Sequence, residues 1–188
     1  MIIGSHNTMT YQKPFKWYYK PFIWMVRCQN KDIDTQYKEY NVRVFDIRVY
    51  KSKTDGNWYT RHGLVTLFPF NLYNLLDKIN NYGDCWVQLV LEISRKDEDE
   101  ETSFVQLCAE VERLFPNIRF IGGVRKYDWK CLYEFKNTLS INGKFSSSPK
   151  NPKFLGIFPK LYSLLFNKKF YKEPIDEDCL MLDFVNIK

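Results

Sequence analysis

The chain has 188 residues, a net charge of +6, and a composition of 45% hydrophobic and 18% aromatic residues, which excludes an intrinsically disordered protein and predicts a single domain over residues 1–188. No apolar run reaches the roughly 20 residues that span a bilayer. The first residues lack a basic segment followed by an apolar one, so we expect no transmembrane helix, no signal peptide, and a cytoplasmic or peripheral membrane location.

The basic residues are spread along the chain and mixed with acidic ones, so we expect no nucleic-acid partner. The number of cysteines is odd, and none has the spacing of a zinc site. We therefore expect reduced, buried thiols and no disulfide framework. The five cysteines are Cys28, Cys85, Cys108, Cys131 and Cys179.

The N-terminal part begins with a short buried strand over residues 1–4, which leads into a polar loop. Residues 11–27 are dense in aromatic and basic side chains, and Pro14 and Pro21 prevent one regular helix there. Aromatic residues mixed with lysines suit the headgroup zone of a bilayer, so residues 13–24 are predicted to contact a membrane peripherally. An aromatic-rich loop packed over the domain explains the same residues.

The next segment predicts a helix and a β-hairpin. Asp32 or Asp34 caps a helix that runs to Tyr40, and Asn41 ends it. Residues 42–64 then form two paired strands around the turn residues 54–57, because a β-branched and aromatic run precedes a turn containing Gly56.

The rest of the chain alternates helix and strand. Residues 85–93 are too apolar for a strand with one face in water, which indicates a covered, parallel sheet. In order, we expect a helix at 71–81, the strand at 85–93, a solvated acidic loop at 96–101, a helix at 102–115, a strand at 117–124, a loop or abbreviated element at 141–152, a helix from about 155 to 167 interrupted by Pro159, and a buried strand at 179–187 that carries Asp183.

This alternation predicts an α/β fold. Six or seven strands joined by mostly parallel crossovers favour a small or incomplete (β/α) TIM-type barrel over an open sheet, with short or missing helices because a full barrel needs about 250 residues. Reactive side chains of such a fold lie at the C-terminal ends of strands. The candidates on or just after predicted strands are His6, Asp46, Arg48, His62 and Asp183.

Asp46 and Arg48 lie two residues apart, so their side chains share one face of a strand. Buried charges are tolerated when they pair with each other or face a ligand. The pair is therefore a site candidate, and an ordinary ion pair at a sheet edge is the alternative.

The chain contains two histidines, His6 and His62, and each follows a predicted strand. Histidine takes and gives protons near neutral pH, so two of them can serve as general base and general acid. One histidine alone would more often be structural, but two together with an Asp-x-Arg motif and a lone aspartate favour a catalytic site. Arg48 supplies a permanent cation for a phosphate, and Asp183 can hold one imidazole in its working tautomer.

Four segments in order resemble the X-domain of phosphatidylinositol-specific phospholipase C, especially its small metal-independent bacterial members. They are Gly4-Ser5-His6-Asn7-Thr8, the Arg-x-x-Asp-x-Arg strand ending at Arg48, His62-Gly63, and the closing LMLDFVN. The resemblance implies that His6 deprotonates the inositol 2-hydroxyl and that His62 protonates the diacylglycerol oxygen. It also implies that Asp46 and Arg48 lie beside the phosphate and that Asp183 orients His6.

Asn7 and Arg48 are the two positions at which this sequence can be compared with the metal-independent and the calcium-dependent members of the family. Asn7 stands where bacterial enzymes commonly have Asp, and it resembles a ligand of the calcium-dependent eukaryotic enzymes. Arg48 occupies the place of an acidic calcium ligand, so the resemblance implies metal-independent catalysis without a cofactor, although Glu92 retains a calcium-binding chemistry. Asn7, Lys96 and Arg125 are the predicted substrate-binding residues. Further candidates for the inositol ring are Lys126, Tyr127 and Trp129.

The expected function is that of a phosphoric diester hydrolase or lyase that converts a phospholipid or another phosphodiester to a cyclic phosphate. A catalytically silent lipid-binding or headgroup-binding protein on the same fold is one alternative. A glycerophosphodiester phosphodiesterase is another, but its usual His-Arg-Gly opening and acidic metal ligands are absent from this sequence.

Overall fold

The computed structural model describes residues 1–14, 16–63, 65–66, 70–147 and 157–187. The chain divides into two compact units, one made of Met1–Phe45 with Leu139–Lys188 and the other of Asp46–Thr138. Below they are unit 1 and unit 2. The strand β2 (Val42–Lys51) contributes its first residues to unit 1 and its last to unit 2. The single domain expected from the length stays a prediction.

Unit 1 is built on parallel strands. β1 (Ile2–Ser5) pairs with the start of β2 on one side and with β9 (Cys179–Leu182) on the other, and β9 pairs with β8 (Ile141–Lys144). A Cβ atom at Gly4 would lie 2.9 Å from Sγ of Cys179 and 3.0 Å from Sδ of Met181. A side chain at position 4 would therefore displace the side chains of Cys179 and Met181 on β9.

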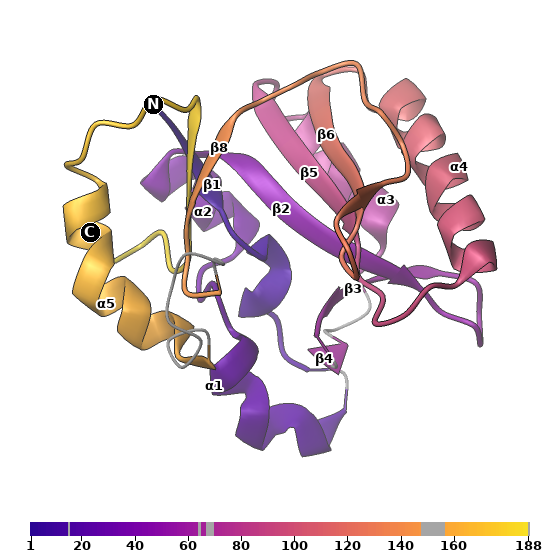
Figure 1. The fold of residues 1–188 in the computed structure, drawn as a ribbon, viewed down its shortest axis with the longest axis horizontal. Coiled ribbons are helices and arrows are strands. Elements are labelled where there is room, and N and C mark those ends of the chain that lie inside the picture. Colours follow the sequence, from indigo (N-terminus) through magenta and orange to yellow (C-terminus); the bar gives the residue numbers. More distant parts are fainter. Residues whose placement is uncertain (15, 64, 67–69, 148–156, 188) are drawn as a thin grey trace. The chain divides into compact units, whose positions relative to one another are not determined.

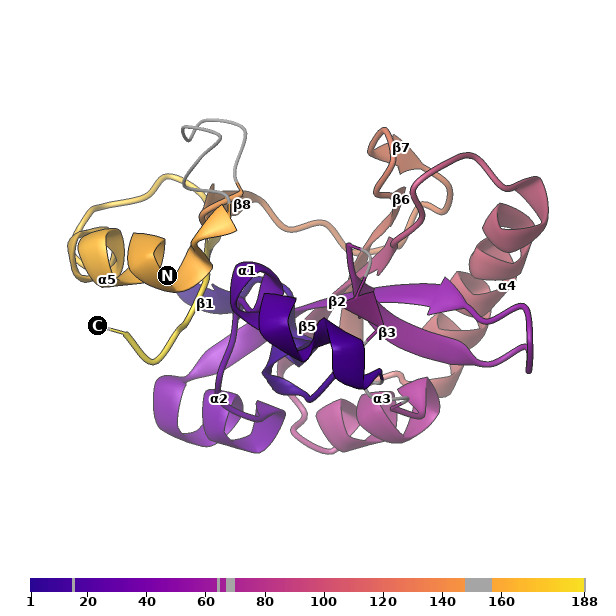
Figure 2. The same ribbon diagram turned by 90° about the horizontal axis from the view of Figure 1, so that it is seen from below.

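Short helices surround this sheet. They are the 3₁₀ helices η1 (Thr8–Tyr11) and η2 (Trp17–Phe22) and the α-helices α1 (Ile23–Val26), α2 (Ile33–Tyr40) and α5 (Pro159–Phe170). Figure 2 shows α2 and α5 on opposite sides of β1. Residues 11–27 do not form one regular helix, as expected from their prolines. The predicted ends of α2 are also confirmed, because the Asp32 side chain accepts a bond from the Thr35 N–H and Asn41 takes a left-handed φ of 56°.

Three expectations for unit 1 need correction or restriction. Pro159 does not interrupt α5 but begins it, because the first-turn N–H groups of a helix need no intrahelical partner. Asp183 follows β9 instead of lying within it, since the strand ends at Leu182. Of the expected segment 141–152, the first four residues form β8, and residues 148–152, like the expected helix start at 155, lie outside the described part.

Unit 2 combines a hairpin with a parallel strand pair. β2 runs antiparallel to β3 (Trp58–His62), which also pairs with β4 (Val65–Thr66), so the predicted hairpin is confirmed up to residue 63; residue 64 is not described. β5 (Cys85–Leu91) lies next to β2 and runs parallel to β6 (Ile118–Arg125), and the short β7 (Lys130–Cys131) runs antiparallel to β6.

Two helices complete unit 2. α3 (Leu72–Asn80) begins after Asn71, whose side chain accepts a bond from the Asn74 N–H. α4 (Glu98–Leu114) packs on β5 and β6 (Figure 1). The predicted loop at 96–101 is wrong from Glu98 onward. Asp97 caps α4, and the acidic residues of its first turn interact favourably with the helix dipole.

The cysteines are free, and four of the five are buried, as expected for reduced thiols. Cys131 is exposed, which corrects the prediction for that residue. Among the described residues, no helix combines the length and the apolar character that crossing a membrane requires.

Candidate active site

His6 follows β1 directly and is fixed by contacts on several sides. Its backbone N–H donates to the carbonyl of Leu182 at 2.9 Å, which extends the pairing of β1 with β9 by one residue. Nδ1 lies 2.7 Å from Oδ1 of Asp183, and the imidazole stacks on Phe145 with a centroid distance of 3.9 Å and an interplanar angle of 8°. A carboxylate at Nδ1 favours the tautomer that leaves the lone pair on Nε2. The residue is buried, with 1% of its surface exposed.

Asp183 is held by donors from distant parts of unit 1. Its Oδ2 accepts bonds from the backbone N–H and from Oγ of Ser146, both at 2.8 Å. Its carbonyl accepts from Nδ2 of Asn167 at 2.8 Å and from Oγ of Ser163 at 3.1 Å. The carboxylate and the backbone that carries it are therefore fixed independently. The sequence analysis did not identify Ser146, Ser163 or Asn167, and no motif or spacing marks them.

Asn7 adopts a left-handed conformation with φ of 47°, a region that asparagine visits more readily than most residues. Its Nδ2 lies 3.0 Å from Nε2 of His6. Gln29 supports the same loop, because its Nε2 donates to the carbonyls of His6 (3.1 Å) and Leu182 (2.9 Å), and its Oε1 accepts the Val185 N–H at 3.2 Å. The structure thus brings His6, Asn7 and Asp183 together in unit 1.

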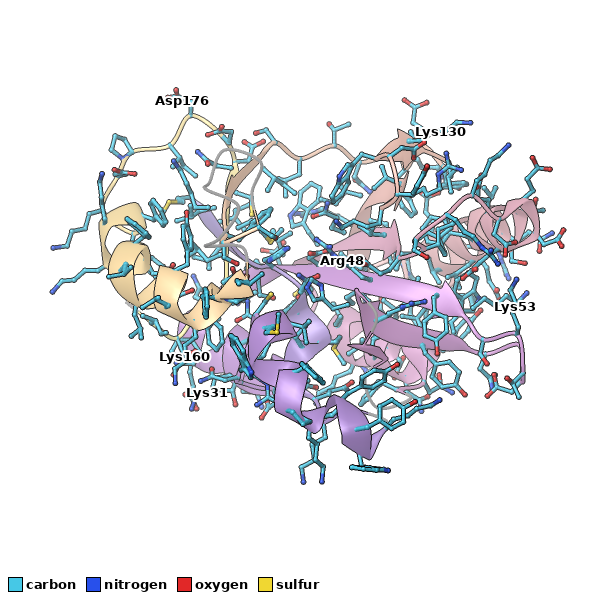
Figure 3. The ribbon with its side chains drawn as sticks, turned by 60° about the horizontal axis from the view of Figure 1, so that its bottom comes forward. Lys31, Arg48, Lys53, Lys130, Lys160 and Asp176 are labelled. Atoms are coloured by element: carbon cyan, nitrogen blue, oxygen red, sulfur yellow. The ribbon has the colours of Figure 1, made fainter. Side chains whose placement is uncertain are left out.

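Unit 2 contains a cluster of buried charges. Nη2 of Arg48 lies 3.1 Å from Oδ2 of Asp46, and its Nη1 lies 3.4 Å from Oε2 of Glu92. Asp46, Arg48 and Glu92 are 2%, 6% and 7% exposed, so the expected pairing on one strand face is confirmed. Figure 3 shows Arg48 among other side chains, whereas Lys53 and Lys130 project from the edge of the drawing.

His62 is the last residue of β3 and is partly buried. The N–H of the next residue, Gly63, donates to Oε1 of Glu92 at 3.1 Å. Since Glu92 also contacts Arg48, one carboxylate links the turn after His62 to the guanidinium. From the sequence alone, Glu92 is predicted only as a possible calcium ligand.

An aromatic residue and a second cation lie beside Arg48. The Trp129 ring centroid is 5.8 Å from Cζ of Arg48 and 5.1 Å from Nζ of Lys126. Burial, and to a smaller degree the positive charge of Arg48, lowers the pKa of the Lys126 ammonium, while Glu92 and Asp46 oppose this effect. Trp129 has a φ of 58°, an unusual backbone conformation for a bulky residue. The cluster therefore places two cations beside one aromatic ring.

No family model and no curated protein matches this sequence. Among solved structures, the phosphatidylinositol-specific phospholipase C from Listeria monocytogenes matches with a TM-score of 0.63 over 97% of this chain and 87% of that one, at 13% sequence identity. The fold resembles that of a bacterial phospholipase C. The expected α/β class with a small or incomplete TIM-type barrel is therefore confirmed, and at this identity the match concerns the fold alone.

The predicted substrate-binding residues differ in their surroundings. Lys96 is exposed and pairs with Glu98 at 2.7 Å. Arg125 is 4% exposed and pairs with Asp128 at 2.6 Å and with Glu101. Its hydrogen bonds to Asp128 and Glu101 raise the pKa of the Arg125 guanidinium. Two carboxylates already offset its charge.

The acidic residues of unit 2 do not fit the calcium site of the eukaryotic enzymes. The carboxylates of Asp46 and Glu92 both contact the guanidinium of Arg48. A calcium ion takes six to eight oxygen ligands, and here a fixed cation already lies between two of the candidate carboxylates.

Proposed function

We propose that this protein is a phosphodiesterase of the phosphatidylinositol-specific phospholipase C type, which cleaves a phospholipid by intramolecular attack and forms a cyclic phosphate. The observation that carries the proposal is the contact of 2.7 Å between His6 and Asp183, residues that follow the adjacent parallel strands β1 and β9. In barrel enzymes, catalytic groups lie at such strand ends. The fold shared with a bacterial phospholipase C supports the same assignment.

The reaction begins at His6. Asp183 keeps the proton on Nδ1, so Nε2 accepts the proton of a substrate hydroxyl next to the phosphodiester. The hydroxyl oxygen attacks phosphorus as it loses this proton, and a new P–O bond closes the ring. Asn7, whose amide lies beside Nε2, acts as a neutral hydrogen-bond partner at this step.

His62 completes the reaction as the general acid. The bond from phosphorus to the leaving alcohol breaks, and His62 gives its proton to the departing oxygen. The substrate loses one proton to His6 and its leaving group gains one proton from His62. The total charge of the substrate is therefore the same before and after the reaction.

Arg48 stabilises the negative charge of the phosphate, a role that suits a permanently charged, planar donor in a desolvated position. Asp46 and Glu92 hold the guanidinium in place. Lys126 and Trp129 lie close enough to Arg48 to help bind an anionic headgroup. Lys96 and Arg125 remain proposed substrate-binding residues, although both already contact carboxylates. Because the cation at the phosphate is a side chain, we propose that catalysis needs no calcium.

The aromatic stretch at 13–24 is the proposed membrane contact. Trp17, Phe22 and Trp24 are 78%, 57% and 52% exposed, and Lys13, Lys16 and Lys20 of the same stretch are also exposed. Large aromatic side chains beside lysines suit the interface of an anionic bilayer. Trp24 also stacks on Phe158 at 5.4 Å, so part of the stretch packs on the protein itself.

The test is product analysis with phosphatidylinositol vesicles. We expect a cyclic inositol phosphate and diacylglycerol, and a bell-shaped dependence of kcat/KM on pH that reports one base and one acid. Binding of the vesicles without any product would instead identify a silent lipid-binding protein. Release of an open-chain phosphate as the first product would contradict intramolecular attack.

A further inference from the structure

Three potential metal ligands converge in unit 1. One ligand atom from each of His6, Cys28 and Asp183 lies within 4.8 Å of the other two. Their side chains belong to residues that are 1%, 2% and 0% exposed. Two of them form the pair described above, but the proposed reaction has no use for the thiol of Cys28.

The backbone fixes the position of Cys28. Its N–H donates to Oγ1 of Thr10 at 2.9 Å. Its carbonyl accepts the N–H of Phe184, the residue after Asp183, at 2.6 Å. Nδ2 of Asn7 lies 3.4 Å from Sγ of Cys28 and 3.0 Å from Nε2 of His6. The thiol and the imidazole are therefore neighbours because of the main-chain arrangement.

The ligand types select one class of metal ion. Imidazole nitrogen, thiolate sulfur and carboxylate oxygen are the usual ligands of Zn²⁺, at roughly 2.0–2.3 Å. Tetrahedral geometry at these bond lengths separates ligand atoms by roughly 3.3–3.8 Å. The widest spacing therefore has to contract by about 1 Å, and Nδ1 of His6 and Oδ1 of Asp183, which lie 2.7 Å apart, have to separate if both bind the metal. Ca²⁺ and Mg²⁺ prefer oxygen ligands, and a thiolate disfavours them.

We propose that His6, Cys28 and Asp183 form an inhibitory site for a thiophilic divalent cation such as Zn²⁺. The cation replaces the thiol proton of Cys28, which is released, and takes an oxygen of Asp183 and one ring nitrogen of His6, with the ring proton held on the other ring nitrogen. Three protein ligands leave a fourth position for water. The inhibitory effect rests on the proposed function, because a metal bound to His6 and Asp183 removes the general base. A chelator then restores activity instead of abolishing it.

The binding test uses Co²⁺ as the probe, because Co²⁺ bound to a thiolate gives a ligand-to-metal charge-transfer absorption. The parent protein carries Cys131→Ser, which removes the exposed thiol. We expect the band to saturate at one Co²⁺ per chain, and Cys28→Ser to abolish it. Cys179→Ser is the matched control, since Cys179 is buried in the same unit and burial raises the pKa of its thiol to about 12. No band in the parent, or an equal band in Cys28→Ser, would overturn the site.

The activity test adds Zn²⁺ during hydrolysis of phosphatidylinositol. Each protein is compared with its own metal-free rate after preincubation, since the ligands are buried. We expect at least a tenfold loss in the parent, recovery with EDTA, and less than a twofold loss in Cys28→Ser. A cobalt band without inhibition by Zn²⁺ would overturn the inhibitory role. Absence of hydrolysis in the metal-free parent would count against the proposed function and leave the cobalt result to decide the site.

Discussion

The buried charges of Asp183 in unit 1 and of Arg48 in unit 2 are stabilised by different kinds of partner. In unit 1, the carboxylate of Asp183 is surrounded by neutral donors, namely the imidazole of His6 and both the N–H and Oγ of Ser146. In unit 2, the guanidinium of Arg48 is held by two full negative charges, those of Asp46 and Glu92. Dipoles fix orientation in the first region, and ions balance one another in the second.

This difference predicts different sensitivities to substitution. Removing a neutral donor leaves an acceptor short of one hydrogen bond, which costs on the order of 1–3 kcal/mol. Removing one member of a buried ion cluster leaves an uncompensated charge, which costs about 3–5 kcal/mol. Single substitutions around Asp183 should therefore cost less stability than substitutions within the ion cluster of unit 2, where conservative changes are needed.

The largest expected effect concerns the two histidines. His6→Ala and His62→Ala should each lower kcat by at least the roughly 100-fold that a general acid or base contributes. Circular dichroism and thermal unfolding should show that both variants stay folded. The double variant should lose little beyond the worse single one, because the two residues act in one reaction. Activity close to that of the unchanged protein in either single variant would contradict the assignment.

Arg48→Ala should have the next largest effect. It should lower kcat by about 100- to 1,000-fold, the range seen when one transition-state donor is removed. Since Arg48→Ala also leaves Asp46 and Glu92 unbalanced, Arg48→Lys serves as the folded comparison, because it keeps the charge but loses the planar donor geometry. EDTA should leave the unchanged enzyme fully active. Loss of activity in EDTA that calcium restores would show that Arg48 does not replace a metal.

Ser146→Ala should lower kcat by about tenfold, which corresponds to roughly 1.4 kcal/mol, because Oδ2 of Asp183 keeps the backbone donor but loses the hydroxyl. Ser163→Ala is the matched control, since its hydroxyl bonds to the carbonyls of Pro159 and Asp183 and not to the carboxylate. Both variants should lose about 1 kcal/mol of stability in urea unfolding, but Ser163→Ala should retain most of its kcat. Equal losses of kcat would mean that Ser146 acts through stability alone.

Lys126 provides a test with opposite signs for stability and activity. Its pKa is lowered in the folded protein from 10.5, so the folded state binds fewer protons than the unfolded one, and stability rises with pH between the lowered pKa and 10.5. Lys126→Met should therefore be more stable than the unchanged protein at pH 7, and the gain should vanish as pH approaches 10.5. Its kcat/KM on an anionic lipid should fall several-fold. Lys130→Met, at an exposed lysine, is the control for both measurements.

The smallest effect on hydrolysis is expected at the membrane contact. Trp17→Ala should weaken binding to anionic vesicles without changing the melting temperature, because Trp17 is 78% exposed. Trp24→Ala should lower both, since Trp24 also stacks on Phe158. Neither should alter hydrolysis of a soluble substrate analogue. Leu114→Ala, at an exposed residue of α4, controls for loss of apolar surface. Unchanged vesicle binding by Trp17→Ala would exclude the contact.

Local patterns predicted the features that depend on neighbouring residues. Turn chemistry explains the caps of α2 and the hairpin around Gly56. Strand periodicity explains why Asp46 and Arg48 share one face. The loop predicted at 96–101 was wrong from Glu98 onward, because acidic residues that suit a solvated loop also suit the first turn of a helix.

Contacts between distant segments carried no such pattern. Ser146 reaches Asp183 across 37 residues, from a stretch that resembled a loop. The sequence predicts Cys28 only as a reduced, buried thiol, and its place beside His6 depends on how the segment before α2 packs against the end of β9. The fold was therefore accessible from the sequence, and so were the positions of His6 and Asp183 after their strands, but the residues that contact them were not.

The bond between His6 and Asp183 joins residues that are 177 positions apart. Closing a loop of that length costs on the order of 4–5 kcal/mol of chain entropy, and β1 pairs with β9 only after that closure. At about 5–20 residues per second, a ribosome adds Asp183 roughly 9–35 s after His6. Under the proposed mechanism, a nascent chain thus carries its general base before it carries the carboxylate that orients that base.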